Sequence, residues 1–264
     1  MLRPLRFSIQ NQPFFLLPIE GGLFDMGMEK DDPDAYGWEQ PVHPVRVPTF
    51  YLAQYPVTQA LWAAVMGREE WEPFFTGDER PMERVSWDDA QVFLKKLQTA
   101  TQQPFRLPSE AEWEFAARGG IYSLPPGEGR GGVDSPPGEG RAASRNLGGG
   151  VYSGSQRLKE VGWYAGNSHG ETKPVGCKFP NELGLYDMSG NVWEWCEDDL
   201  FNDYQYAPSD GSAWIDKLDR RADRVCRGGS GRLKVFGCHI AYRGHWEPKY
   251  RGNNNGLRLA LSLQ

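Results

Sequence analysis

Alternating apolar and polar positions predict short strands in the first part of the chain. Residues 14–28 indicate two strands around the Gly21-Gly22 turn, because short apolar runs are bounded there by turn-forming residues. Residues 42–52 alternate well enough for another strand, which its prolines confine to a sheet edge or split in two. Residues 105–108 form a short extended run. The pattern therefore predicts a small sheet.

Three segments place their apolar residues at helical spacing instead. We expect a helix over residues 59–66, capped by Thr58, and a second helix after Ser86, which begins with a capping-box-like pair. A third helix is predicted over residues 110–118, with Ser109 as its N-cap and acidic residues in its first turn.

The C-terminal region, residues 224–264, has two patterned ends and an unpatterned middle. Arg227-Gly228-Gly229-Ser230 indicates a tight turn, and residues 256–263 predict a final strand. Gly231 to Asn255, called the C-terminal segment below, mixes apolar, aromatic and basic residues without a period. Such a segment in a rigid frame is typical of a ligand-contacting surface, and it is also compatible with an ordinary surface loop. The pattern alone favours the ordinary loop.

Composition narrows the fold class. The chain has 264 residues with 39% hydrophobic residues and ten tryptophans, which indicates a globular fold with aromatic clusters. Its 32 glycines and 20 prolines predict short elements and long loops, unlike a helical bundle. Residues 121–150 contain Pro-Pro-Gly-Glu-Gly-Arg twice and are predicted to be a Gly/Pro-rich surface insertion.

Charge and cysteine usage restrict partners and location. A net charge of −6 without a basic block argues against binding to nucleic acid. We read no signal peptide and no membrane span, which predicts a cytoplasmic protein, although display at a surface stays open. The four cysteines are then expected to be reduced core thiols, and their spacing predicts no zinc site.

The densest motif runs from Gly184 to Cys196. With this motif and others in the same order, the chain resembles the formylglycine-generating-enzyme (sulfatase-modifying factor) family. The matching stretches are Gly21-Gly22, Met26-Gly27, Val57-Thr58-Gln59, Val85-Ser86-Trp87, residues 106–114, residues 184–195, residues 227–230 and Gly256-Leu257-Arg258. The resemblance implies one C-type-lectin-like, α+β domain over residues 1–264, with a small antiparallel sheet, two or three helices and long loops.

The resemblance also implies a test for catalysis. The oxidase of this family resembles a copper-thiolate enzyme with two cysteines five residues apart after the Gly-Gly-Ser turn, and thiolates suit Cu(I). Here Cys238 matches the second position, Leu233 replaces the first, and Cys226 lies before the turn. The catalytic pair is broken, so we predict no catalytic residue and no enzyme. The iron-dependent relatives need a further helical-bundle domain with histidine ligands. We read no such domain in this sequence, whose histidines are His43, His169, His239 and His245, and this argues against an iron-dependent function.

A third function implied by the resemblance is that of a variable protein of a diversity-generating retroelement, in which the active site is replaced by a mutable binding face. Asn253, Asn254 and Asn255 look like unmutated template positions, and most of the segment's residue types are reachable by changing adenines in an asparagine codon. Trp246 and Lys249 need other template codons. The predicted ligand-binding positions are Gly231, Arg232, Leu233, Val235, Phe236, Gly237, His239, Ile240, Gly244, His245, Trp246, Tyr250, Gly252, Asn253, Asn254 and Asn255.

We therefore expect non-catalytic recognition of an unknown protein or other macromolecular ligand, with no cofactor required. The alternatives are a copper-dependent formylglycine-generating oxidase acting on a sulfatase cysteine, and a structural or assembly protein on the same fold.

Family resemblance further implies a structural calcium. Asp187 and Glu194 would supply side-chain oxygens, and Gly190 and Val192 backbone carbonyls, a ligand set that suits calcium. The alternative is that Asp187 caps a turn and Glu194 pairs with an arginine such as Arg227 or Arg258. We expect Trp193 and Trp195 to pack in the core, and Cys238 to be a structural thiol because the sequence supplies no activating base beside it. Asn167 is a weaker candidate, for a second metal site.

Overall fold

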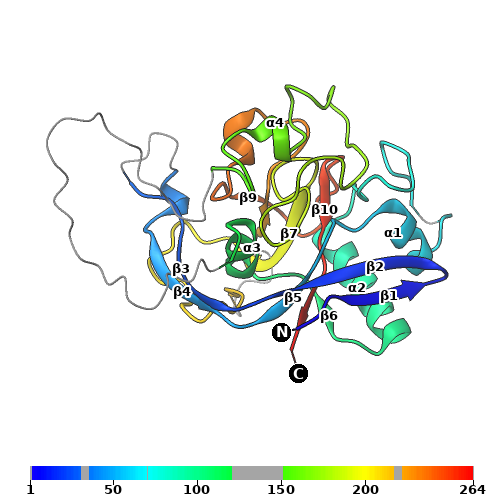
Figure 1. Cartoon of the computed structure of the whole chain (residues 1–264), viewed down its shortest axis with the longest axis horizontal. Helices are drawn as coiled ribbons and strands as arrows, with labels where there is room; N and C mark the ends of the chain where they lie inside the picture. The colour runs from blue at the N-terminus through cyan, green and yellow to red at the C-terminus, as the bar shows by residue number, and fades with distance from the viewer. Residues whose placement is uncertain (1, 31–35, 70, 121–150, 217–221, 264) are drawn as a thin grey trace, which may run out of the picture.

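Three β-sheets and four α-helices form the described part of the molecule (Figure 1). The computed structural model describes residues 2–30, 36–69, 71–120, 151–216 and 222–263. The predicted α+β class is confirmed. The predicted insertion at 121–150 lies outside the described residues.

The largest sheet has five antiparallel strands. Their order is β1 (Leu5–Ile9), β2 (Gln12–Ile19), β5 (Phe50–Ala53), β11 (Ala260–Ser262) and β6 (Phe105–Arg106). The strand β1 was not predicted, because Gln10 and Asn11 interrupt the apolar run. These two residues instead form the hairpin turn, with positive φ angles of 46° and 67°.

A four-stranded sheet carries the frame of the C-terminal segment. Its order is β10 (Asn255–Leu257), β7 (Trp193–Asp199), β8 (Arg224–Arg227) and β9 (Gly244–Trp246). The pair β7–β10 is parallel, with Asn255 opposite Trp193, whereas β8 is antiparallel to both β7 and β9. The expected small antiparallel sheet is therefore three sheets with one parallel pair. The third sheet pairs β3 (Gly22–Met26) with β4 (His43–Val47).

The predicted single strand over residues 256–263 is wrong in detail. Two short strands in different sheets, β10 and β11, occupy this stretch. Arg258 lies between them with its side chain fully buried, and its guanidinium binds the Glu194 carboxylate. The chain therefore leaves the four-stranded sheet at this residue and joins the five-stranded one.

Local capping explains the three longer helices. The helices α1 (Gln59–Met66), α2 (Trp87–Thr101) and α3 (Glu110–Ala117) begin where the sequence predicts. Thr58, Ser86 and Ser109 each accept a hydrogen bond from a backbone N–H of the first turn. A fourth helix, α4 (Leu158–Val161), is short and was not predicted from the sequence. Two 3-10 turns, η1 (Gly37–Glu39) and η2 (Val235–Cys238), complete the elements.

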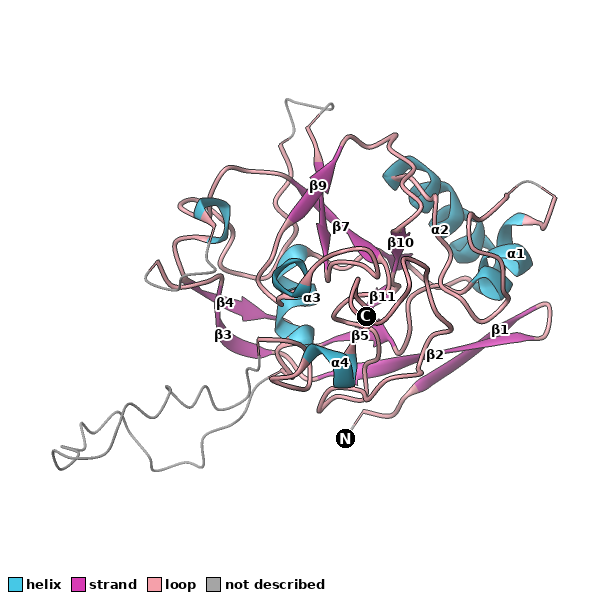
Figure 2. Ribbon diagram, turned by 90° about the horizontal axis from the view of Figure 1, so that it is seen from above, coloured by secondary structure: helices cyan, strands magenta, loops and turns pink. Residues whose placement is uncertain are grey.

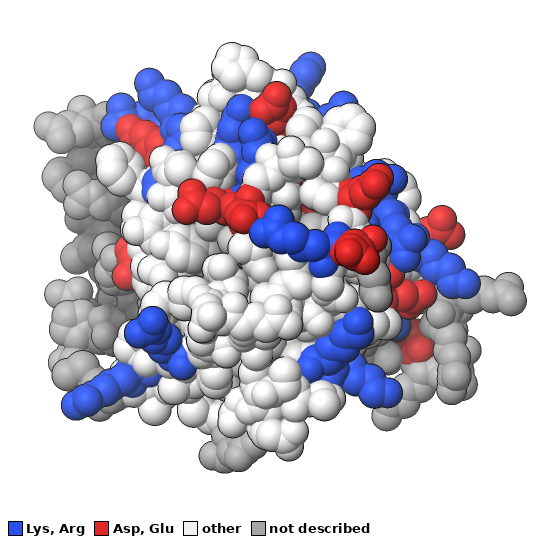
Figure 3. All heavy atoms as spheres, turned by 90° about the vertical axis from the view of Figure 1, so that its right-hand side faces the viewer, with Lys and Arg blue, Asp and Glu red and all other residues white. Residues whose placement is uncertain are grey.

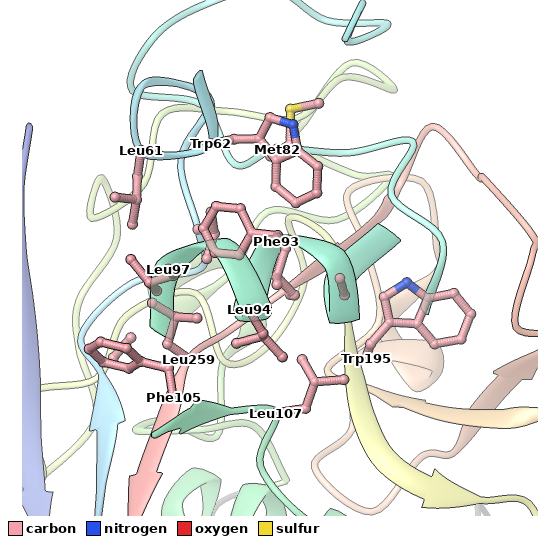
Figure 4. Packing of buried hydrophobic residues seen from close by; sticks show 14 of the residues in the cluster. Leu61, Trp62, Met82, Phe93, Leu94, Leu97, Phe105, Leu107, Trp195 and Leu259 are labelled. Atoms are coloured by element: carbon pink, nitrogen blue, oxygen red, sulfur yellow. The ribbon is translucent and has the colours of Figure 1, made fainter. Parts of the chain in front are cut away.

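Helices α1 and α2 pack on the five-stranded sheet through a large apolar cluster (Figure 4). Trp62 of α1 stacks on Phe93 of α2 with ring centroids 4.7 Å apart. Trp193 and Trp195 are 3% and 0% exposed and belong to the same cluster, which confirms their predicted core position.

The other long helix, α3, packs against the two-stranded sheet on one side and the four-stranded sheet on the other (Figure 2). It is buried along its whole length, although it carries three glutamates. Buried charges need partners. Glu112 pairs with Arg106, whereas Glu110 and Glu114 pair with arginines that hold the C-terminal segment.

The sequence also made predictions about the thiols, the surface charge and membrane spans. Cys196, Cys226 and Cys238 are buried free thiols as expected, whereas Cys177 is exposed and is not a core thiol. On the face shown in Figure 3, acidic and basic side chains are mixed in the upper half, and the basic side chains of the lower half lie in two separate groups. Among the described residues, no helix has the length and apolar character needed to cross a membrane.

Candidate functional site

The turn before the C-terminal segment is fixed by close packing. Gly228 and Gly229 have φ angles of 91° and 72°, which favour glycine. A Cβ atom on Gly229 would lie 2.2 Å from the carbonyl oxygen of Gly237, so no larger residue fits there. The turn therefore fixes the direction in which the backbone enters the C-terminal segment.

The middle of the C-terminal segment is tied to the core by Arg227 of β8. Its guanidinium donates to the carbonyl oxygens of Ile240 and Ala241 at 2.9 and 2.8 Å. The same fully buried guanidinium pairs with Glu114 and Glu110 of α3. One side chain thus joins α3 to the backbone of the segment.

A second buried arginine, Arg243, ties the segment from within. Its Nε and Nη2 donate to the two carboxylate oxygens of Glu110 at 2.7 and 2.9 Å. Its Nη1 donates to the carbonyl oxygens of Trp38 and Phe201 at 2.7 and 3.0 Å. Arg243 therefore binds the segment to α3 and to η1 at once.

Electrostatics keeps this network charged. Burial alone would raise the pKa of Glu114, but the nearby Arg118 and Arg227 guanidinium groups outweigh it and hold the pKa below its ordinary value. Breaking one member would leave an uncompensated buried charge. The anchors are therefore expected to be rigid features of the fold.

The structure leaves nine of the predicted binding positions wholly or partly accessible. Arg232, Val235, Phe236 and Tyr250 are exposed, and the half-buried positions are Leu233, His245, Trp246, Asn253 and Asn254. Arg232 Nη1 donates to Asn253 Oδ1 at 2.8 Å, and His245 Nδ1 lies 2.8 Å from Asp223 Oδ2. These nine positions form the candidate binding surface.

Three other predicted positions belong to the core, which corrects their expected place on the surface. Ile240 is 2% exposed in the apolar cluster around α3. His239 is 6% exposed, and its ring meets that of Tyr152 edge-on at 5.2 Å. Asn255 is fully buried in β10. Each is buried because the anchored backbone and the parallel β7–β10 pair turn its side chain inward.

The four predicted glycines are also buried, which corrects their expected role as contacts. A Cβ on Gly244 would lie 2.8 Å from the Trp193 ring, and one on Gly231 3.0 Å from a backbone carbonyl oxygen. A Cβ on Gly252 would lie 2.5 Å from Asn255 Oδ1. A Cβ on Gly237 would meet the Leu233 side chain at 2.8 Å. Close packing therefore constrains these positions.

Aromatic rings outside the predicted set adjoin the accessible positions. Tyr242 meets Phe236 at 6.2 Å and Tyr36 at 5.5 Å, both edge-on. Trp38 stacks on Tyr36 at 5.4 Å and meets His245 edge-on at 6.5 Å. The residue type of Tyr242 resembles that of predicted contacts and could have indicated it. The sequence around Tyr36 and Trp38 gives no such signal, because a tertiary contact brings them there.

At the candidate catalytic position, the chemistry does not favour a nucleophile. Cys238 is buried in a small apolar cluster that Leu233 partly covers. Burial raises the pKa of the Cys238 thiol to about 12. A thiolate is the form that attacks or binds copper, so this environment suits a structural thiol.

The two carboxylates predicted to hold calcium, Asp187 and Glu194, already accept hydrogen bonds from protein donors. Both Glu194 oxygens accept from Arg258, at 2.7 and 2.8 Å, and Oε2 also accepts from Trp113 Nε1. Asp187 Oδ2 accepts from the Gly176 N–H at 2.8 Å, so this carboxylate caps a turn. No three His, Cys, Asp or Glu side chains of the described chain gather as a metal site.

Comparison with known protein families finds one match over nearly the whole chain. The profile of the sulfatase-modifying factor enzyme 1-like domain matches residues 10–263. Among characterised proteins, the chain is 30% identical to the chaperone protein LppX of Paenibacillus barcinonensis, covering 94% of this chain and 89% of that one. It is 30% identical to a formylglycine-generating enzyme of Thermomonospora curvata, covering 90% and 71%. An inactive Cα-formylglycine-generating enzyme 2 of Bos taurus is 28% identical, with 80% of each covered.

Two solved structures share the fold over their full lengths. Treponema denticola variable protein 1 superposes with a TM-score of 0.76 at 25% identity, covering 100% of both chains. PvdO from Pseudomonas aeruginosa superposes with a TM-score of 0.78 at 26% identity, also covering 100% of both. Relatives on this scaffold thus include a protein named as an enzyme, one named as inactive and one named as variable.

Proposed function

The chain belongs to the sulfatase-modifying factor enzyme 1-like family, and from that premise we propose that it is a non-catalytic ligand-binding protein. Its C-terminal segment would be the binding surface, diversified by a retroelement that rewrites selected codons. The likeness to Treponema denticola variable protein 1 over the full chain supports this proposal.

One observation carries the proposal: the backbone of the segment is held by residues outside the predicted variable set. Arg227 binds two carbonyl oxygens in the middle of the segment, and Arg243 binds Glu110. Nine predicted positions are nevertheless accessible. Side chains there can change without removing an anchor, which is what a diversified surface requires.

The accessible side chains are suited to binding a macromolecule. Phe236 and Tyr250 are 40% and 38% exposed, and Trp246 stacks on Tyr250 at 5.5 Å. Aromatic rings supply large contact area at a low entropic cost, and arginine adds directional hydrogen bonds, here from Arg232. We propose that the ligand is a protein or another macromolecule.

The oxidase alternative has less support from the chemistry of this chain. Leu233 offers no thiolate where the enzymes of the family are expected to have one. Cys238 holds its proton too tightly to act as a thiolate near neutral pH. A direct assay separates the readings: with copper, oxygen and a cysteine-containing sulfatase peptide, we expect no formylglycine. Conversion that Cys238→Ala abolishes would establish the oxidase instead.

Two libraries test the binding proposal. One randomises accessible positions: Arg232, Val235, Phe236, His245, Trp246 and Tyr250. The matched library randomises buried ones: Gly231, His239, Ile240, Gly244, Gly252 and Asn255. Displayed on yeast and challenged with protease, most members of the first library should stay folded and most of the second should be cleaved. Equal loss in both libraries would show that the segment is ordinary structure and would defeat the proposal.

A genomic observation tests the retroelement. We expect a reverse-transcriptase gene near this one, and a near-copy of the C-terminal coding sequence that differs at adenines. Differences spread equally over all four bases would argue against diversification. Folding tolerance in the libraries would then still support a binding surface.

A further inference from the structure

The aromatic pair of η1 is the feature that the proposed binding surface leaves unexplained. Tyr36 and Trp38 are 37% and 38% exposed, although rings of this size are normally covered. Their planes are 6° from parallel with centroids 5.4 Å apart, so each ring covers part of the other. A pair of exposed, mutually stacked rings is a ready contact surface.

Buried polar groups hold this pair in place. Glu39, 1% exposed, accepts the Tyr36 N–H at 3.0 Å through Oε2. Arg243 Nη1 donates to the Trp38 carbonyl oxygen at 2.7 Å. The Met28 N–H donates to the carbonyl oxygen of Glu39 at 2.9 Å. The rings are therefore set on a fixed turn, and the cost of ordering them on binding is low.

The pair is continuous with the accessible part of the C-terminal segment. Tyr36 meets Tyr242 edge-on at 5.5 Å, and Tyr242 meets Phe236 at 6.2 Å. Trp38 reaches His245 on the other side at 6.5 Å. Resting on the proposed binding function, we infer that Tyr36 and Trp38 form a fixed half of the binding surface, which remains constant while the segment varies.

Charge around the surface indicates what the fixed half would recognise. Within the C-terminal segment, Arg232, Lys234, Lys249 and Arg251 are exposed, against the single exposed acid Glu247. The chain as a whole carries a charge of −6, so the excess of exposed basic side chains is a local feature of the segment. Complementary charge steers and orients a partner. The partner is a protein loop that presents aromatic or proline side chains flanked by aspartate or glutamate.

A single-stranded nucleic acid would also stack on aromatic rings, but the surface favours it less. Binding of a phosphate backbone relies on many basic contacts and on a basic domain. The segment has four exposed basic side chains, of which Arg251 is paired with Asp89, in a chain of net charge −6, and these provide little of this. Because the rings of Tyr36 and Trp38 already stack on each other, part of their faces is also unavailable to a base.

A random 12-residue peptide library panned on the purified chain tests the inference. We expect enrichment of peptides that combine Trp, Tyr or Pro with Asp or Glu. For a synthetic peptide so selected, Trp38→Ala should weaken binding at least about tenfold, and Trp38→Phe should restore part of it. The matched control is Phe15→Ala, at a 37% exposed ring in β2 of the five-stranded sheet, which should change nothing.

Each of the other possible results would overturn a different part of the inference. Loss of binding with Tyr250→Ala but not with Trp38→Ala would remove the fixed half and leave the proposed function standing. Binding insensitive to both, or no enrichment at all, would defeat the surface itself. Selection of basic peptides, or displacement of the peptide by oligo(dT), would overturn the acidic protein partner. Circular dichroism of Trp38→Ala checks that the fold is kept.

Discussion

Arg243 and Glu110 form a bidentate pair in the interior, with Nε–Oε1 and Nη2–Oε2 distances of 2.7 and 2.9 Å. Glu110 is the first residue of α3, and Arg243 lies at the middle of the C-terminal segment. The segment is thus not a loop that hangs from its two ends. Its midpoint is bound to the core by a charged contact, which explains how an unpatterned stretch can hold one backbone conformation.

Removing this anchor should destabilise the fold strongly. Arg243→Ala leaves the Glu110 carboxylate buried without its bidentate partner, and such changes cost about 3–5 kcal/mol. Urea unfolding followed by tryptophan fluorescence measures the loss. The control is Arg68→Ala, which breaks the exposed Arg68–Asp78 pair and should have little effect. A similar small change in both variants would mean that the anchor is not structural.

Close packing at Gly244 gives a second prediction. A Cβ there would lie 2.8 Å from the Trp193 ring, and Trp193 is nearly fully buried. Gly244→Ala should therefore destabilise the protein by about 1–3 kcal/mol, as overpacked positions do. Gly37→Ala is the matched control, because a Cβ at Gly37 meets nothing within 4 Å. Thermal unfolding midpoints that fall equally in both variants would contradict the packing argument.

Helices were predictable from sequence because their signals are local. The hydroxyl caps at Thr58, Ser86 and Ser109 act on N–H groups within three residues, and each one marks a helix start in the structure. The order of the family's motifs also predicted the fold class, because the residues of those motifs are spread over the whole chain.

Features that depend on distant partners were not predictable. Arg258 divides the expected final strand because it binds Glu194, 64 positions away. Ile240 lies in the core because Arg227 holds its carbonyl oxygen. Its residue type gives no sign of this, because isoleucine is one of the types reachable from an asparagine codon. The Tyr36–Trp38 pair lies beside the binding surface because Arg243 donates a hydrogen bond to the Trp38 carbonyl oxygen, and these two residues are 205 positions apart in the sequence. Without alignment to a structure, residue type cannot separate the accessible positions from the buried ones.

Stability should decrease as the pH rises from about 4.5 to 7, in part because of Glu83. Burial raises the pKa of Glu83 to about 7 from an ordinary value of 4.5. Between these values the unfolded chain releases a proton that the folded chain keeps, so unfolding is favoured as the pH rises. Above about 7 both states are ionised, and the contribution to the pH dependence ends.

Glu83→Gln isolates that contribution, because the amide resembles the protonated acid and can still accept the Phe75 N–H. The variant should match the native protein in stability below pH 4.5 and be more stable than it at pH 8.5. Urea unfolding across this range measures both. Glu20→Gln, at an exposed carboxylate, is the control and should leave the pH profile unchanged. A parallel profile for Glu83→Gln would show that Glu83 does not titrate as stated.

Cysteine reactivity separates a structural thiol from a catalytic one. Burial raises the pKa of Cys238 to about 12, and the pKa values of Cys196 and Cys226 are also raised by burial, whereas Cys177 is exposed. Iodoacetamide reacts with thiolates. At pH 8 we expect mass spectrometry to find Cys177 modified in the folded protein, and all four thiols modified in urea. Cys177→Ser is the control and should leave the folded protein unlabelled. Rapid labelling of Cys238 in the folded state would mean that its thiolate is available, and copper-dependent chemistry would then have to be reconsidered for this chain.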